Sequence, residues 1–121
     1  MTHPMTIHLK NLKLAARLGV FDWERQMIRE FPTQVQVKVT ALDGIRQDDL
    51  QSTLDYALIE DFLRRHAAQD EWQLIERLVV SLADASLQEF PMIEEITLTL
   101  HKPGALEKTE SVGVTYTQKR A

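Results

Sequence analysis

The 121-residue sequence contains no cysteine, only four glycines and four prolines, and 7% aromatic residues. Without cysteine, the chain can form neither a disulfide framework nor a thiolate metal site. No apolar run approaches the ~20 residues of a membrane span, and the first residues, MTHPMTIHLKNLK, contain no apolar signal core. We therefore expect one domain, residues 1–121, in the cytoplasm.

The chain also lacks a large net charge of either sign. The chain carries 14 basic and 18 acidic residues, a net charge of -4, and contains no block of like charge. Because phosphate binding needs a basic stripe, we expect no nucleic-acid partner. The sequence also has neither a Walker loop nor a dinucleotide-binding glycine motif.

Alternating apolar and polar residues predict four β-strands. They cover residues 5–15, with a bulge near Asn11, and residues 33–42, 94–101 and 111–118. Apolar residues at helical spacing predict two helices, over residues 55–68 and 72–89. Thr53 or Asp55 can cap the first helix, and Pro91 ends the second.

The order ββααββ predicts an α+β fold, in which a four-stranded antiparallel sheet carries two helices on one face. The other face would be polar, comprising Thr6, His8, Gln36, Lys38, Thr40, Thr97, Thr99, His101, Thr115 and Thr117. Such a face could simply be the solvated side of an open sheet. It could instead line a barrel formed by several subunits, which would also remove exposed strand edges.

Lys102 is held at a strand end, because Pro103 restricts it to extended conformations and Gly104 then allows a turn. It is either an ordinary hairpin lysine or a positioned group for proton transfer. Glu76 lies within or beside the apolar stripe of the second helix. It is either an exposed carboxylate near a helix start or a partly buried carboxylate that accepts hydrogen bonds from a ligand. Tyr56 fits the core stripe of the first helix but could project its hydroxyl beyond it.

Glu24 lies in a predicted loop beside Arg25, where a surface ion pair is the ordinary interpretation. None of the four histidines forms a His-x-His or His-x-x-x-His pair. His8 and His101 could meet across the polar face, but two histidines without a third ligand make a poor zinc site. We therefore expect neither a metal nor a cofactor.

Several short motifs are arranged in order along the chain: GVFDWER (19–25), STLDYALI (52–59), LIERL (74–78), LHKPGA (100–105) and SVGV (111–114). Together they resemble the dihydroneopterin aldolase family of folate biosynthesis. The resemblance implies the tunnelling fold, in which subunits join their sheets into a barrel. It also implies a homo-oligomer, a tetramer or octamer, with active sites at subunit interfaces.

The resemblance implies a metal-free retro-aldol cleavage of 7,8-dihydroneopterin into 6-hydroxymethyl-7,8-dihydropterin and glycolaldehyde. Glu76 and the backbone at Ile75 would bind the pterin. Lys102 would be the catalytic lysine, with Glu24 near it. Tyr56, also catalytic, and the substrate-binding backbone at Leu54 would come from the neighbouring subunit.

Three alternatives remain open at this point. The sister enzyme dihydroneopterin triphosphate 2'-epimerase shares the fold and the bond chemistry. Zinc enzymes of the tunnelling fold, such as GTP cyclohydrolase, act on related compounds, although the scattered histidines speak against them. A non-catalytic pterin-binding oligomer would need every motif to be coincidental or vestigial. The sequence departs from the family pattern at Asp55, where some relatives have histidine, and in the charged run after KPGA, residues 106–108.

Overall fold

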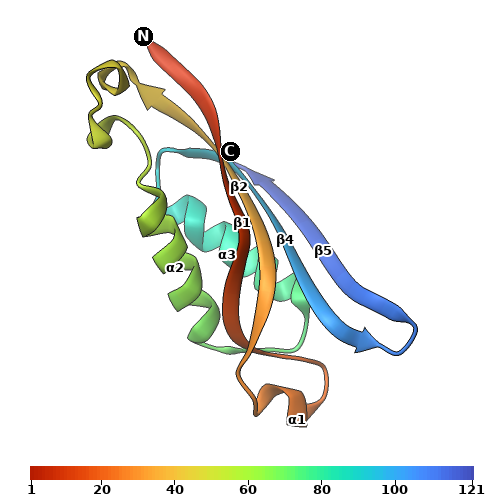
Figure 1. Ribbon diagram of the computed structural model, residues 1–121. Helices are drawn as coiled ribbons and strands as arrows, with labels where there is room; N and C mark the ends of the chain where they lie inside the picture. Colours follow the sequence, from red (N-terminus) through yellow and green to blue (C-terminus); the bar gives the residue numbers. More distant parts are fainter.

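In a computed structural model that describes all 121 residues, one curved sheet carries two long helices on the same side (Figure 1). The strands are β1 (Thr2–Leu18), β2 (Arg29–Leu42), β3 (Glu71–Trp72), β4 (Ile93–Leu106) and β5 (Thr109–Lys119). The helices are α1 (Asp22–Arg25), α2 (Tyr56–Ala68) and α3 (Ile75–Glu89), with 3-10 turns η1 (Asp43–Gln47) and η2 (Leu50–Ser52). The predicted α+β class is confirmed. No helix is long and apolar enough to cross a membrane.

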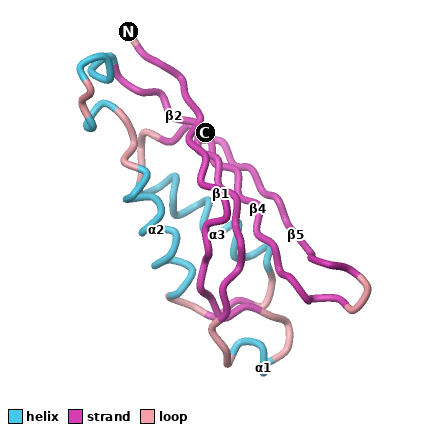
Figure 2. The backbone as a smooth tube through the Cα atoms, in the orientation of Figure 1, coloured by secondary structure: helices cyan, strands magenta, loops and turns pink.

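The sheet has the strand order β3-β1-β2-β4-β5. The four long strands pair antiparallel, as predicted, and they run side by side in Figure 2. A fifth strand was not predicted: β3 pairs in parallel with the end of β1, Arg17 opposite Glu71 and Leu18 opposite Trp72. Two residues are too few to show an alternating pattern.

The predicted bulge near Asn11 is confirmed. The pairing of β1 with β2 shifts between Leu9 and Leu12, and Asn11 has a φ of 56°. The side-chain oxygen of Asn11 accepts a hydrogen bond from Gln34 Nε2 at 2.8 Å. The bulge moves the inward face of β1 from odd-numbered to even-numbered residues, so that Leu12 and Leu14 are buried.

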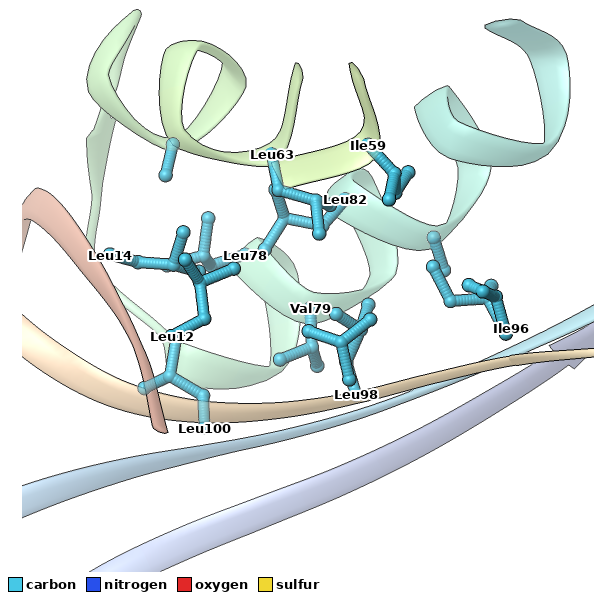
Figure 3. Close-up of a cluster of buried hydrophobic side chains, with 14 of the residues drawn as sticks. Leu12, Leu14, Ile59, Leu63, Leu78, Val79, Leu82, Ile96, Leu98 and Leu100 are labelled. Atoms are coloured by element: carbon cyan, nitrogen blue, oxygen red, sulfur yellow. The ribbon is translucent and has the colours of Figure 1, made fainter. Parts of the chain in front are cut away.

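The core lies between the sheet and the helices (Figure 3). Large buried side chains include Leu12, Leu14, Ile59, Leu63, Leu78, Val79, Leu82, Ile96, Leu98 and Leu100. Each such side chain contributes about 1.5–3 kcal/mol on burial. The opposite face is polar as predicted, with Thr97 bonded to Thr117 and Thr99 to Thr115, each pair 2.8 Å apart.

β1 and β2 extend beyond their predicted ranges, and residues 22–25 of the predicted loop form α1. Two further boundaries are wrong. The second long helix begins at Ile75, not at residue 72, because Trp72 belongs to β3 and donates its indole N–H to Ala67 O at 2.9 Å. Trp72 fits the helical spacing of the apolar residues, so the pattern placed it in the helix. It is buried instead because it belongs to a paired strand. Likewise, Pro103 and Gly104 do not end β4, which continues to Leu106 with a shift in pairing after Pro103.

Candidate active site

An open pocket of ≈ 500 Å³ lies where α1, the start of α3 and the far end of β4 meet. Four of the predicted site residues line it: Glu24, Ile75, Glu76 and Lys102. They come from three elements that are distant in sequence. The antiparallel pairing of β4 with β2, which follows α1, and the return of the chain from α2 to α3 bring these elements to one end of the sheet (Figure 1).

Glu24 is a buried residue of α1, 7% exposed. The expected surface ion pair with Arg25 is therefore wrong. Arg25 instead pairs with Asp22, and its Nη1 donates to the backbone oxygens of Gly19 at 2.8 Å and Val20 at 2.9 Å. Arg25 thus ties the segment together from outside, while Glu24 turns inward.

Gly19 makes room for the inward carboxylate. A Cβ at this position would lie 2.4 Å from both Cβ and Cδ of Glu24, closer than atoms approach in proteins. The backbone N–H of Gly19 donates to Trp72 O at 2.9 Å, which fixes the segment against β3. A side chain here would force Glu24 out of its position.

Three donors hold the Glu24 carboxylate. Lys102 Nζ lies 2.8 Å from Oε2, and Arg29 Nη2 lies 3.3 Å from the same atom. The backbone N–H of Phe21 donates to Oε1 at 3.2 Å. The hydrogen bond from Lys102, with those from Phe21 and Arg29, lowers the pKa of Glu24 against the opposing effect of burial.

Lys102 is fixed by this ion pair as well as by its backbone. Its side chain is 12% exposed, and it lies in β4 opposite Val112, with Pro103 opposite Ser111. Gly104 follows with a φ of 74°, in the left-handed region. The lysine is therefore a positioned group, not a mobile hairpin side chain.

Glu76 is exposed in the first turn of α3 and borders the pocket. It lies beside the buried stripe of α3, not within it, and forms no ion pair. Ile75, 9% exposed, begins the helix. No side chain caps α3 at Leu74, so the N–H groups of the first turn remain available to a ligand.

Tyr56 and Leu54 are not part of this pocket. Tyr56 is the first residue of α2 and is 65% exposed, which contradicts the expected core packing of its ring. Asp55 rather than Thr53 caps the helix, accepting from Ala57 N at 2.9 Å. Leu54 lines a different pocket beside Leu58. The start of α2 lies at the end of the helix layer remote from α1 (Figure 1).

Arg29 lines the pocket and was missed from the sequence. Arg29 follows Glu24 by five residues, with a turn between them. This spacing matches neither a helix nor a strand, so no sequence pattern could have indicated their contact. Phe21 and Trp23 also line the pocket and are exposed, with their rings stacked 6.3 Å apart.

The histidines are not brought together. His8 lies opposite Gln36, which is opposite Thr97 on the next strand, whereas His101 lies opposite Gly113. No group of three or more histidine, aspartate and glutamate side chains is placed to hold a metal ion.

Comparison with known proteins identifies the family. The family model for dihydroneopterin aldolase matches residues 7–117. Dihydroneopterin aldolase of Escherichia coli K12 is 25% identical over 108 residues, covering 89% of this chain and 88% of that protein. Dihydroneopterin triphosphate 2'-epimerase of Pseudomonas aeruginosa is 26% identical over 109 residues, covering 90% and 88% of the two chains.

Solved structures agree with the sequence relatives. The FolB protein of Vibrio cholerae O1 superposes with a TM-score of 0.88 at 25% identity, covering 96% of this chain and 98% of that one. The E. coli aldolase in complex with neopterin gives a TM-score of 0.83 at 25% identity, covering 94% and 98%. The subunit fold implied by the resemblance is thereby confirmed, and the chain belongs to the dihydroneopterin aldolase family.

Proposed function

We propose that this single-domain protein, residues 1–121, is a cytoplasmic enzyme of folate biosynthesis. It cleaves 7,8-dihydroneopterin into 6-hydroxymethyl-7,8-dihydropterin and glycolaldehyde. The observation that carries the proposal is the Lys102–Glu24 ion pair, 2.8 Å long, in a pocket that Glu76 also borders. The family supports this function, and its E. coli member was crystallised with neopterin.

Glu76 anchors the pterin. Its carboxylate has no ion-pair partner at the pocket wall, so the 2-amino group and a ring N–H of the pterin can supply the missing donors. The uncapped first turn of α3 adds the backbone of Ile75 to this recognition. In this proposal, α3 binds the pterin and β4 carries the catalytic lysine.

Lys102 acts as the base. It takes the proton from the tail hydroxyl, directly or through water, as the adjacent carbon–carbon bond breaks. The bonding electrons enter the dihydropterin, whose own C=N bond serves as the electron sink, so neither a Schiff base nor a metal is required. Tyr56 helps to return a proton to the enol-like intermediate. Such general acid–base groups typically contribute about 10²–10⁴-fold in rate.

The active site is completed by a second copy of the chain. Tyr56 and Leu54 lie outside the Lys102 pocket of their own subunit, so they can serve only the pocket of a neighbour. The polar sheet face and the free edge of β5 suit a barrel of several subunits. We expect a tetramer or an octamer.

The epimerase activity is the second candidate, favoured by the P. aeruginosa relative of that name. The same bond cleavage, followed by recombination of the fragments, would invert the C2' centre. The intact LHKPGA motif favours the aldolase.

The test is to incubate the protein with 7,8-dihydroneopterin or its triphosphate, in EDTA, and to resolve the pterins by chromatography. Formation of 6-hydroxymethyl-7,8-dihydropterin from the free substrate supports the aldolase. Only a C2' epimer, formed faster from the triphosphate, would assign the epimerase. Tight pterin binding without any product would indicate a non-catalytic module.

A further inference from the structure

Arg29 is held in place independently of Lys102. Its Nη2 donates to Leu18 O at 2.9 Å, on β1, and its guanidinium carbon lies 5.4 Å from the ring centroid of Phe31, on β2. A guanidinium at this distance from an aromatic ring is attracted to it. Arg29 therefore keeps its position whether or not Lys102 is close to Glu24.

Arg29 and Lys102 share one acceptor. Both reach Oε2 of Glu24, at 3.3 Å and 2.8 Å. The carboxylate is buried, and Gly19 leaves it just enough space behind. If one cation leaves, the carboxylate keeps only the other cation and the backbone N–H of Phe21 as partners. A buried carboxylate without a partner is costly, so the remaining cation must then stabilise its charge.

We propose that Arg29 is a positioning residue that keeps Glu24 paired while Lys102 acts on the substrate. The proposal rests on the function proposed above. As a base, Lys102 must give up its proton and turn towards the tail hydroxyl, which breaks its 2.8 Å ion pair with Glu24. Arg29 stays charged throughout, so the carboxylate never loses its counter-ion.

The charge balance of the pocket supports this role. Its titratable lining groups are Glu24, Arg29, Glu76 and Lys102. Glu76 comes from α3 and is exposed, and Arg25 next to Glu24 is paired with Asp22. Without Arg29, Lys102 would be the only side-chain cation on Glu24, and its movement towards the substrate would leave the carboxylate without a counter-ion. Arg29 thus releases Lys102 for catalysis.

The first test is the pH dependence of turnover in Arg29→Met and Arg29→Lys. We expect Arg29→Met to lower kcat about tenfold with little change in KM, and to move the rising limb of the kcat–pH profile about one unit towards alkaline pH. Arg29→Lys, which keeps the charge, should retain most of kcat and the original limb. An unchanged limb in Arg29→Met, or a change in KM alone, would overturn the proposal.

The second test needs no turnover. Urea unfolding is measured for Arg29→Met, Lys102→Met, the double variant, and the double variant with Glu24→Gln added. If the two cations are alternative partners of one carboxylate, the double variant loses more than the sum of the single losses. Removing the carboxylate charge should then restore stability, even if the double variant alone fails to fold.

Additive losses, or no recovery with Glu24→Gln, would overturn the shared-carboxylate role. An inactive wild-type protein that shows the predicted unfolding pattern would refute only the proposed reaction. The two failures can therefore be told apart.

Discussion

Glu24 and Lys102 form the central ion pair of the pocket, and they are 78 positions apart in sequence. Each is nearly buried, with side-chain exposures of 9% and 12%. Burial makes such a pair more sensitive to the loss of a partner than the exposed pairs elsewhere on the surface. The pair consequently links the stability of the α1 segment to the geometry of the reacting end of β4.

The lowered pKa of Glu24 predicts an acid-sensitive contribution to stability. A carboxyl whose folded pKa lies below its unfolded value, here 4.5, stabilises the fold above that pH and loses this contribution as pH falls through the folded pKa. Glu24→Gln should therefore lower the urea midpoint at neutral pH. The difference from wild type should shrink as the pH falls below 4.5 and through the lowered folded pKa of Glu24, because protonation then removes the charge that distinguishes the two side chains.

Glu95→Gln is a matched control, because Glu95 also accepts from a lysine at 2.8 Å, but from Lys38, whose side chain is 62% exposed. Its loss should be smaller. An equal loss in the two variants, or a Glu24→Gln effect that does not change with pH, would contradict the account.

Among the elements, β4 bends just after Lys102, and this bend sets the direction of the rest of the strand. The pairing with β5 shifts between Pro103 and Leu106, and Gly104 takes a positive φ of 74°. A Cβ at Gly104 would meet no atom within 4 Å. Any cost of a side chain there is therefore a cost of backbone conformation.

We expect Gly104→Ala to destabilise the protein by about 1 kcal/mol, because alanine resists the left-handed region. Gly104→Asn should cost less, since asparagine enters that region more readily. Thermal unfolding of the two variants measures the difference. Equal stability of wild type and Gly104→Ala would show that the bend relaxes easily and does not fix Lys102.

The elements that the sequence predicted well are those whose pattern follows directly from burial. Val35, Val37 and Val39 alternate with polar residues, and all three are buried on β2. The prediction failed where a helix and a strand both explain the same apolar position. Trp72 fits the apolar stripe of a helix but is buried by pairing with β1. Pro103 and Gly104 indicated a strand end, yet a bulge accommodates both.

The site was predictable only in part, and for a related reason. Lys102 stood out because of its proline and glycine, whereas the contact of Glu24 with Lys102 and Arg29 depends on how α1 folds back. Local sequence favoured Arg25 as the partner of Glu24. The space that Gly19 leaves for the carboxylate becomes evident only in three dimensions.

At the scale of the whole molecule, the proposed site residues fall into two groups. Lys102, Glu24, Glu76 and Ile75 share one pocket, and Tyr56 lies outside it. A head-to-tail interface would join the two groups from adjacent subunits and close into a ring. The polar sheet face and the free edge of β5 suit such an assembly, whereas the meeting of Tyr56 with a neighbour's Lys102 rests on the proposed function.

Mixing two inactive variants tests the shared site. Lys102→Ala and Tyr56→Phe subunits are each expected to be nearly inactive. If they are dissociated and reassembled together, about one quarter of the interfaces should combine an intact Lys102 with an intact Tyr56, and activity should return. Separately reassembled variants are the control. No recovery in a confirmed mixed oligomer would place both residues outside a shared site.

In the proposed reaction, Lys102 carries out bond cleavage while Glu76 binds the pterin. The most direct measurement is the single-turnover formation of 6-hydroxymethyl-7,8-dihydropterin by Lys102→Ala and Glu76→Ala, with pterin affinity measured on the same samples. We predict that Lys102→Ala slows product formation by at least about 10²-fold and leaves affinity close to wild type. Glu76→Ala should instead lose mainly affinity. Loss of binding in Lys102→Ala with unchanged residual chemistry would contradict the account.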